Sequence, residues 1–142
     1  MTAIERFEDI KAWQKARDLA KEAYDITCQG DFAKDYSLKD QIRRASVSIM
    51  SNIAEGYARQ TDKEFVQFLH IALGSVAEVQ SQLYVAQDLG YISNGQFKEI
   101  HELSGETAKL INGFIKYLRQ SAVNRQKSTV NKEGKDKSEN DN

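Results

Sequence analysis

The stretch QIRRASVSIMSNIAEGYAR, residues 41–59, decides the fold class of this chain. Its apolar residues recur at the spacing of one α-helix face, at Ile42, Ala45, Ile49 and Ile53. The whole chain contains no proline, so no residue of that kind interrupts a long helix. The same stretch also holds an adjacent arginine pair, three serines, an asparagine and a glutamate. A helix that only fills a core does not need this polar set, so the sequence predicts a helix with an additional role.

Three further segments show helical periodicity. The first covers about residues 7–29, and Gly30 after it suits a left-handed C-terminal cap. Capping-box patterns stand before the other three helices, at Ser37, Thr61 and Ser93. Gly90 is expected to end the third helix. Four long helices with short connections predict an all-α, antiparallel up-down-up-down four-helix bundle over residues 1–123.

The sequence also predicts which residues around the first helix face the core. One side of this helix carries Ile10, Trp13, Ala16, Ala20, Ala23 and Tyr24. The loop GDFAKDY (30–36) contains two aromatic residues, Phe32 and Tyr36, which we expect to fold back onto the end of the bundle. Residues 124–142 contain one aliphatic residue, Val130, among many charged ones. This composition predicts a disordered polar tail, separate from the bundle.

The second helix has more apolar surface than a monomeric bundle requires. Its two apolar stripes together cover about half of the circumference, whereas a stripe of roughly 100° is sufficient for one core face. One interpretation is an oligomer interface formed by Arg43, Val47, Met50, Ala54 and Tyr57. The third helix shows a similar surplus at Ile71, Val85 and Leu89. The alternative is that these helices are buried on two sides within their own chain.

Composition excludes several function classes. No apolar run approaches the roughly 18 residues of a transmembrane helix, and the start MTAIERFEDIK is not expected to be a signal peptide. A single cysteine, Cys28, cannot form an intrachain disulfide, so we expect a reduced, cytoplasmic setting. No membrane partner is expected.

Catalytic and metal-binding patterns are missing from the sequence. The dinuclear sites of four-helix bundles need a glutamate three residues before a histidine, but Gln67 precedes His70 and Lys98 precedes His101. No glycine-rich phosphate loop and no nucleophile–base pair is recognisable. We therefore expect no enzyme activity, no catalytic residues, no metal and no cofactor. His70 is interpreted as a partly buried polar residue on a helix flank.

Basic residues gather around the second helix and the turn that follows it. The candidates for nucleic-acid contact are Lys39, Arg44, Arg59 and Lys63. Since the net charge is −1, such a surface has to be a local patch rather than a global basic surplus. The alternative is that the arginines pair with carboxylates on neighbouring helices, at Asp40, Glu55 or Glu78.

Several short motifs, taken together, resemble one protein family. They are FEDIKAWQKA (7–16), QIRRASVSI (41–49), NIAEG (52–56), FLHIALGS (68–75) and LGYI (89–92). On these motifs, over about residues 7 to 118, the chain is similar to the 23S rRNA-intervening-sequence proteins, which are small bacterial four-helix bundles. It departs from the relatives at Phe32, which is followed by Ala33 and not by the proline of a Phe-Pro turn.

The resemblance implies a bundle that assembles as a homopentamer. Family members are encoded within intervening sequences of ribosomal RNA genes or by free-standing genes. They are similar to the accessory variability protein of diversity-generating retroelements, a basic pentamer that binds nucleic acid and a reverse transcriptase. The function that this implies is a non-enzymatic oligomeric scaffold for RNA, DNA or a nucleoprotein. The alternative is a protein–protein adaptor ring without direct nucleic-acid binding.

Overall fold

The chain is helical apart from short connections over the range that the structure describes. A computed structural model covers residues 4–140, with side chains described for residues 4–124. In chain order the elements are η1 (Phe7–Asp9) and η2 (Gly30–Lys34), both 3₁₀ segments, and α1 (Lys11–Thr27), α2 (Tyr36–Tyr57), α3 (Asp62–Asp88) and α4 (Asn94–Asn140). The predicted all-α four-helix bundle is confirmed.

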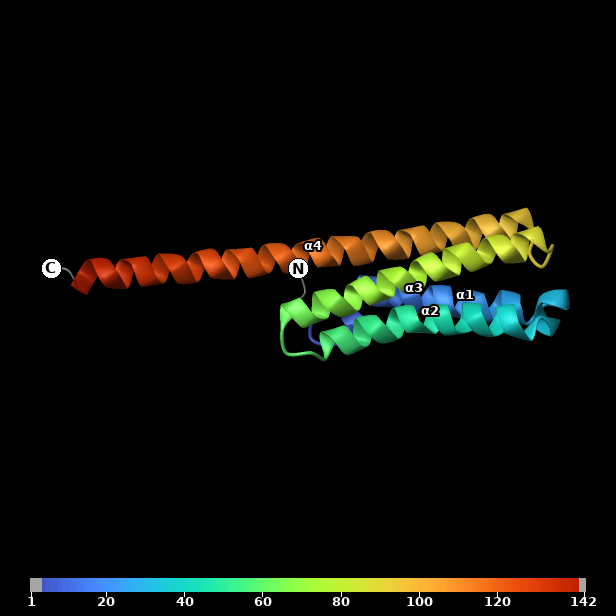
Figure 1. The fold of residues 1–142 in the computed structure, drawn as a ribbon, viewed down its shortest axis with the longest axis horizontal. Helices are drawn as coiled ribbons and strands as arrows, with labels where there is room; N and C mark the ends of the chain where they lie inside the picture. Colours follow the sequence, from blue (N-terminus) through green and yellow to red (C-terminus); the bar gives the residue numbers. More distant parts are fainter. Residues whose placement is uncertain (1–3, 141–142) are drawn as a thin grey trace.

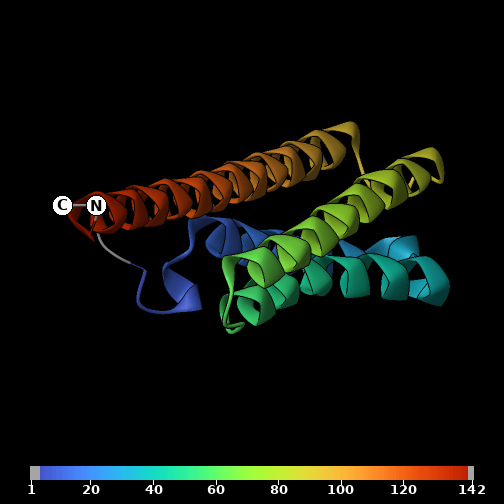
Figure 2. The same cartoon turned by 60° about the vertical axis from the view of Figure 1, so that its left-hand side comes forward.

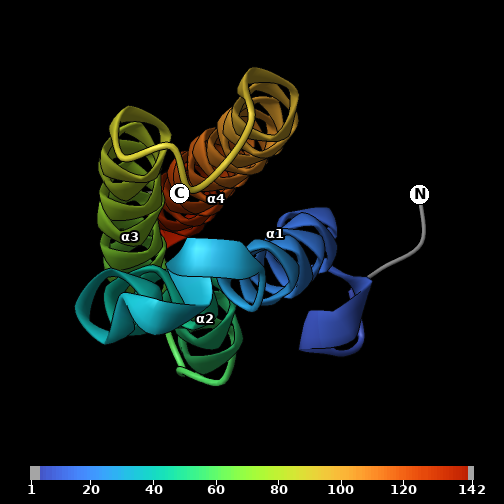
Figure 3. The same cartoon turned by 90° about the vertical axis from the view of Figure 1, so that its right-hand side faces the viewer.

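The four helices occupy the corners of a square when viewed end-on (Figure 3). α1 packs against α2 and α4, and α3 packs against the same two helices, so every connection joins neighbours. The α2–α3 turn lies at the end of the bundle from which α4 projects, and the α4 ribbon continues past this end to Asn140 (Figures 1 and 2). The predicted polar tail, residues 124–142, lies mostly outside the residues whose side chains are described, and its separation from the bundle stays a prediction.

A continuous apolar core fills the space between the helices. All four residues of the predicted α2 stripe, Ile42, Ala45, Ile49 and Ile53, are buried. On α1 the prediction needs correction, because Tyr24 is exposed. The buried series of α1 runs through Ala12, Ala16, Leu19, Ala23 and Ile26. This series follows the core-facing side of the helix, and it turns Tyr24 outward.

Two of the three predicted helix caps are confirmed, and one is wrong. The Thr61 hydroxyl accepts a hydrogen bond from the Glu64 amide at 3.2 Å. Ser93 and Gln96 form a complete capping box, since each side chain accepts from the other residue's amide, at 3.1 and 2.9 Å. The cap of α2 is not Ser37.

Asp35 takes the place of Ser37 as the α2 cap and also ties two loops together. One carboxylate oxygen accepts from the Leu38 amide at 3.1 Å, and the other accepts from the Tyr91 hydroxyl at 2.9 Å. The Tyr91 ring stacks on the fully buried Phe32 ring, with centroids 5.1 Å apart. Phe32 therefore folds back as predicted. Tyr36 does not, because it begins α2 and is largely exposed.

Gly56 permits the close approach of α2 to α3 beside their connecting turn. A Cβ at this position would lie 2.7 Å from Phe65 Cδ2 and 2.8 Å from Phe68 Cβ, which is closer than real contacts allow. Phe65 is buried, so its ring has little room to move. The glycine at position 56 is thus a packing requirement.

We predict that Gly56→Ala destabilises the protein by roughly 1–3 kcal/mol, because the added methyl group overpacks a filled contact. Urea denaturation followed by circular dichroism measures this change. Gly113→Ala is the matched control, since a Cβ at Gly113 meets nothing within 4 Å. That control should be neutral or stabilising by up to about 1 kcal/mol, as alanine favours helix. Equal behaviour of the two variants would contradict the packing role of Gly56.

We predict that Tyr91→Phe reduces the dependence of stability on alkaline pH. The hydrogen bond to Asp35 raises the pKa of Tyr91 above its ordinary value, with smaller contributions from burial and from the charges of Asp35 and Asp31. Because the pKa of Tyr91 is higher in the folded state, its neutral hydroxyl contributes its full stabilisation of the fold below the unfolded pKa of about 10. This stabilisation is lost as the pH rises through the folded pKa. Denaturation midpoints from neutral to alkaline pH test this. The exposed Tyr36→Phe is the control and should follow the unchanged protein.

Candidate nucleic-acid interface

Two of the predicted nucleic-acid contacts, Lys39 and Arg44, already interact with residues of η2 and α2. Lys39 Nζ donates to the Ala33 carbonyl at 2.9 Å and lies 4.7 Å from the centroid of the Tyr36 ring. The Arg44 side chain is 81% exposed and pairs with Asp40 at 2.9 Å, one turn earlier. Asp40 is one of the carboxylates that the sequence offered as the alternative, but the pair forms within α2 and not between neighbouring helices.

The other two predicted contacts, Arg59 and Lys63, lie at the opposite end of α2. Arg59 pairs with Glu55 at 3.0 Å, and its guanidinium stands 4.7 Å from the Phe68 ring centroid. Lys63 is exposed in the first turn of α3. Because an α-helix rises 1.5 Å per residue, Lys39 and Arg59 are separated by about 30 Å. The structure therefore does not gather the four predicted residues into one patch.

The predicted interface residues are partly covered within the chain. Met50, Ala54 and Tyr57 are half-buried against the core, whereas Val47 is exposed. Arg43 reaches α1, where its Nε donates to Thr27 Oγ1 at 2.8 Å and its guanidinium lies 4.4 Å from the ring of the exposed Tyr24. Much of the second stripe of α2 is thus buried in its own chain. A subunit interface on these residues stays a prediction.

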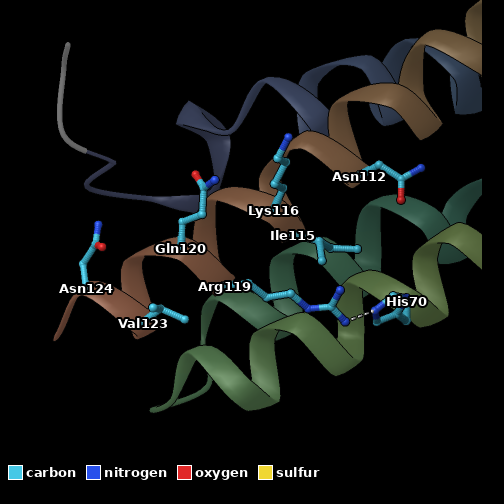
Figure 4. A pocket seen from close by; sticks show the side chains of 8 residues that line it. All are labelled: His70, Asn112, Ile115, Lys116, Arg119, Gln120, Val123 and Asn124. Carbon is cyan, nitrogen blue, oxygen red and sulfur yellow. Dashed lines mark hydrogen bonds between the residues drawn. The ribbon is translucent and has the colours of Figure 1, made fainter. Parts of the chain in front are cut away.

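A cationic groove that sequence analysis did not anticipate lies between α3 and the second half of α4. It encloses about 780 Å³ and is lined by His70, Asn112, Ile115, Lys116, Arg119, Gln120, Val123 and Asn124 (Figure 4). None of these residues is acidic, and most carry side-chain N–H groups. A concave surface with this lining can accept several oxygens of an anionic ligand.

Arg119 links the two walls of the groove. Its guanidinium lies 3.2 Å from His70 Nε2, and Figure 4 shows the side chain reaching from α4 across to α3. Because a guanidinium can only donate, this contact is a hydrogen bond in the tautomer that leaves His70 Nε2 free to accept. His70 is exposed, so its interpretation as a partly buried flank residue is wrong. Lys116 and Gln120 project from the outer side of α4 (Figure 4).

The cationic side of α4 extends beyond the groove. Lys98, Lys109 and Lys116 are exposed and share one side of the helix, since their spacings of eleven and seven residues are close to whole numbers of turns. On α3, Lys63 precedes His70 by seven residues and so lies on the same side of that helix. Of the four predicted contacts, Lys63 is therefore the one that belongs to the α3–α4 surface.

The other flank of α4, toward α1, is acidic. Glu22 on α1 is surrounded by Asp18, Asp25 and Glu99. Burial raises the pKa of Glu22, and the negative charges of Glu99, Asp18 and Asp25 raise it further. Lys15 pairs with Glu106 at 3.4 Å on the same flank. The two sides of α4 thus carry opposite charge, which the net charge of −1 conceals.

The fold and this surface define a four-helix bundle that carries a cationic groove on its outside. Among residues 4–124, no group of three or more His, Cys, Asp or Glu side chains is placed to hold a metal ion. In the described part of the chain, no helix is both long enough and apolar enough to cross a membrane.

The chain belongs to the family of 23S rRNA-intervening sequence proteins, whose model matches residues 8–113. A similar solved structure is a protein of unknown function from the S23 ribosomal protein family of Bacteroides thetaiotaomicron. It is 28% identical, has a TM-score of 0.68, and the match covers 74% of this chain and 98% of that one. No curated protein is a significant match.

One signal in the sequence could have revealed the groove. Asn112, Lys116, Arg119 and Val123 follow one another at helical spacing outside the apolar face of the fourth helix. A cationic and amide series without an acidic residue is a recognisable surface pattern. The contact between Arg119 and His70 cannot be predicted from the sequence pattern, because it depends on the register between α3 and α4.

We predict that Glu22→Gln stabilises the protein at neutral pH. The folded pKa of Glu22 is raised, so the fold disfavours the charged carboxylate, and stability falls as pH rises through the unfolded pKa. The amide removes this cost while keeping the shape of the side chain. Thermal unfolding at acidic and neutral pH should show a gain that is confined to the higher pH. Glu5→Gln, at an exposed glutamate near the N-terminus, is the control, and an equal gain there would contradict the prediction.

Proposed function

We propose that this protein is a non-enzymatic, cytoplasmic, homo-oligomeric scaffold that binds RNA through the α3–α4 surface. The observation that carries the proposal is a groove that is lined by His70, Lys116 and Arg119 and by no acidic residue. Phosphate neutralisation supplies much of the affinity of proteins for nucleic acid, and it needs such a local cationic surface. Membership of the 23S rRNA-intervening sequence protein family supports RNA as the first ligand to test.

The charge distribution supports one direction of approach. The acidic flank around Glu22 and Glu99 repels a phosphate backbone, whereas the α3–α4 side of the same helix attracts it. Arg44 and Arg59 are paired with carboxylates, so a phosphate would have to compete with Asp40 and Glu55. Arg119 contacts the His70 ring and no carboxylate among the groove-lining residues, so an anion would not have to displace an acidic partner there.

The oligomeric part of the proposal rests on the other flank of α3, which faces α2. Ile71, Val85 and Leu89 are 53%, 45% and 56% exposed on this flank, as their position outside the main α3 stripe predicts. Self-association is the usual way in which a soluble chain covers such residues. The family resemblance implies a homopentamer as the assembly.

A protein partner is the second candidate function, and a groove between α2 and α3 favours it. This groove of about 520 Å³ is lined partly by Gln41, Glu78, Gln82 and Val85. Gln82 Oε1 is buried there without a hydrogen-bond partner among the described residues. An incoming polypeptide with an N–H group would satisfy that oxygen. Resemblance to retroelement accessory proteins suggests a reverse transcriptase as one partner to examine.

We predict that Lys116→Ala/Arg119→Ala weakens RNA binding and its salt dependence. Each lost phosphate contact should lower the slope of log affinity against log salt by roughly 0.7 to 0.9, depending on strandedness. Fluorescence anisotropy with a ribosomal RNA fragment over a salt series measures both quantities. The matched control, Arg44→Ala/Arg59→Ala, removes the same charge from the α2 side and should retain most of the affinity.

The outcomes separate the alternatives. Absence of RNA binding by the unchanged protein at low salt would sink the proposal and favour the adaptor function. A larger loss in the Arg44/Arg59 variant would move the RNA site to α2, as the sequence alone suggested. Light scattering on all three proteins checks that the oligomer mass is unchanged, so that a loss of binding is not a loss of assembly.

A further inference from the structure

We infer that the α3–α4 surface binds single-stranded RNA, with a base stacked on Tyr84 and the backbone held near Arg119. This inference rests on the proposed function and adds the class of RNA and a second contact point. The observation behind it is an aromatic cluster on the same side of the bundle as the cationic groove, whose outermost ring, Tyr84, is half exposed.

The aromatic cluster joins α3 to the first turns of α4. The Tyr84 ring lies 4.9 Å from the Phe97 ring and 5.9 Å from the His101 ring, and His101 stacks on Phe97 at 5.2 Å. Tyr84 is 50% exposed, while Phe97 and His101 are half-buried. The two inner rings hold the tyrosine in place, and its exposed part is a rigid aromatic surface on which a base can stack.

Helix geometry places this cluster in line with the groove. His101 and Arg119 are eighteen residues apart on α4, which is five whole turns, so they share one side of the helix. On α3, His70 and Tyr84 are fourteen residues apart, close to four turns and about 21 Å. The antiparallel helices are thus bridged at both ends of one surface, by Arg119–His70 and by Tyr84–His101.

Small side chains occupy the surface between these two ends. Ala77 and Gly105 are exposed, and Ala108 is half-buried. Gln80 donates to Ser104 Oγ at 3.0 Å below them, which satisfies the polar atoms of the floor internally. At Ala77 and Gly105, therefore, no bulky side chain stands in the way of a strand that runs between the cationic end and the aromatic end.

The charges along this surface differ between its ends in a way that suits a single strand. Lys109 and Lys116 border the surface near the groove. At the aromatic end, Asp88 lies one turn after Tyr84 on α3, and Glu102 lies one turn after Lys98 on α4. Phosphates are therefore favoured more strongly at the first end than at the second. Only an unpaired base can turn its face to Tyr84, because the bases of a duplex are stacked on one another.

Binding of a short mixed-sequence RNA, single-stranded or annealed to its complement, tests the inference. The unchanged full-length protein should prefer the single strand. Tyr84→Ala should weaken single-strand binding about tenfold, the size of one lost base–aromatic stack, and leave duplex binding unchanged. Tyr84→Phe should bind as the unchanged protein does, since it retains the ring. This variant also shows that a loss in Tyr84→Ala is not a consequence of altering the position as such.

Tyr117→Ala is the matched control, because Tyr117 is an equally exposed aromatic residue of α4 on a different side of the helix. It should leave binding of both RNA forms unchanged. Unaltered single-strand affinity in Tyr84→Ala, or equal affinity for duplex and single strand, would overturn the inference while the proposed function stands. Failure of both RNA forms to bind at low salt would overturn both.

Discussion

The close contact of Gly56 with α3 is the constraint on which the rest of the bundle depends. With no side chain at Gly56, α2 can lie against Phe65 and Phe68 of α3. Phe65 then packs edge-on against Phe114 of α4, with centroids 5.3 Å apart. This chain of contacts runs from the α2–α3 turn into the α4 segment that carries Arg119. A shift of α3 at Gly56 would therefore be transmitted to the register that brings Arg119 opposite His70.

Asp35 fixes the relative positions of the helices at the other end of the bundle. Its carboxylate caps α2 and accepts from Tyr91 in the α3–α4 connection, so the start of one helix pair is fixed to the turn of the other. The sequence pattern at Ser37 pointed to a different cap, because Ser37 also precedes a periodic segment. Asp35 is the cap, because its carboxylate accepts hydrogen bonds from a first-turn amide of α2 and from the Tyr91 hydroxyl at the same time. A long-range partner of this kind is invisible to a local pattern.

The same distinction explains what the sequence could and could not reveal. Helical periodicity and the caps at Thr61 and Ser93 predict the bundle because they depend on residues within one or two turns. The exposure of Ile71, Val85 and Leu89 also follows from the helical wheel. The pairing of His70 with Arg119 and of Tyr84 with His101 depends on how two helices are aligned. The arginines of the second helix are visible in the sequence as a cluster, whereas the α3–α4 groove forms only when these two helices pack together.

The value of a cation for binding depends on its neighbours more than on its exposure. Arg44 is the most exposed arginine among the predicted contacts, yet Asp40 already neutralises it. Arg119 contacts a histidine in a groove without an acidic lining residue, so an incoming anion displaces no carboxylate of that lining. Because acidic residues are gathered on the α1 flank, a chain with a net charge of −1 can still present a locally positive surface. Net charge limits how far such a surface extends, and the helix faces decide where it is placed.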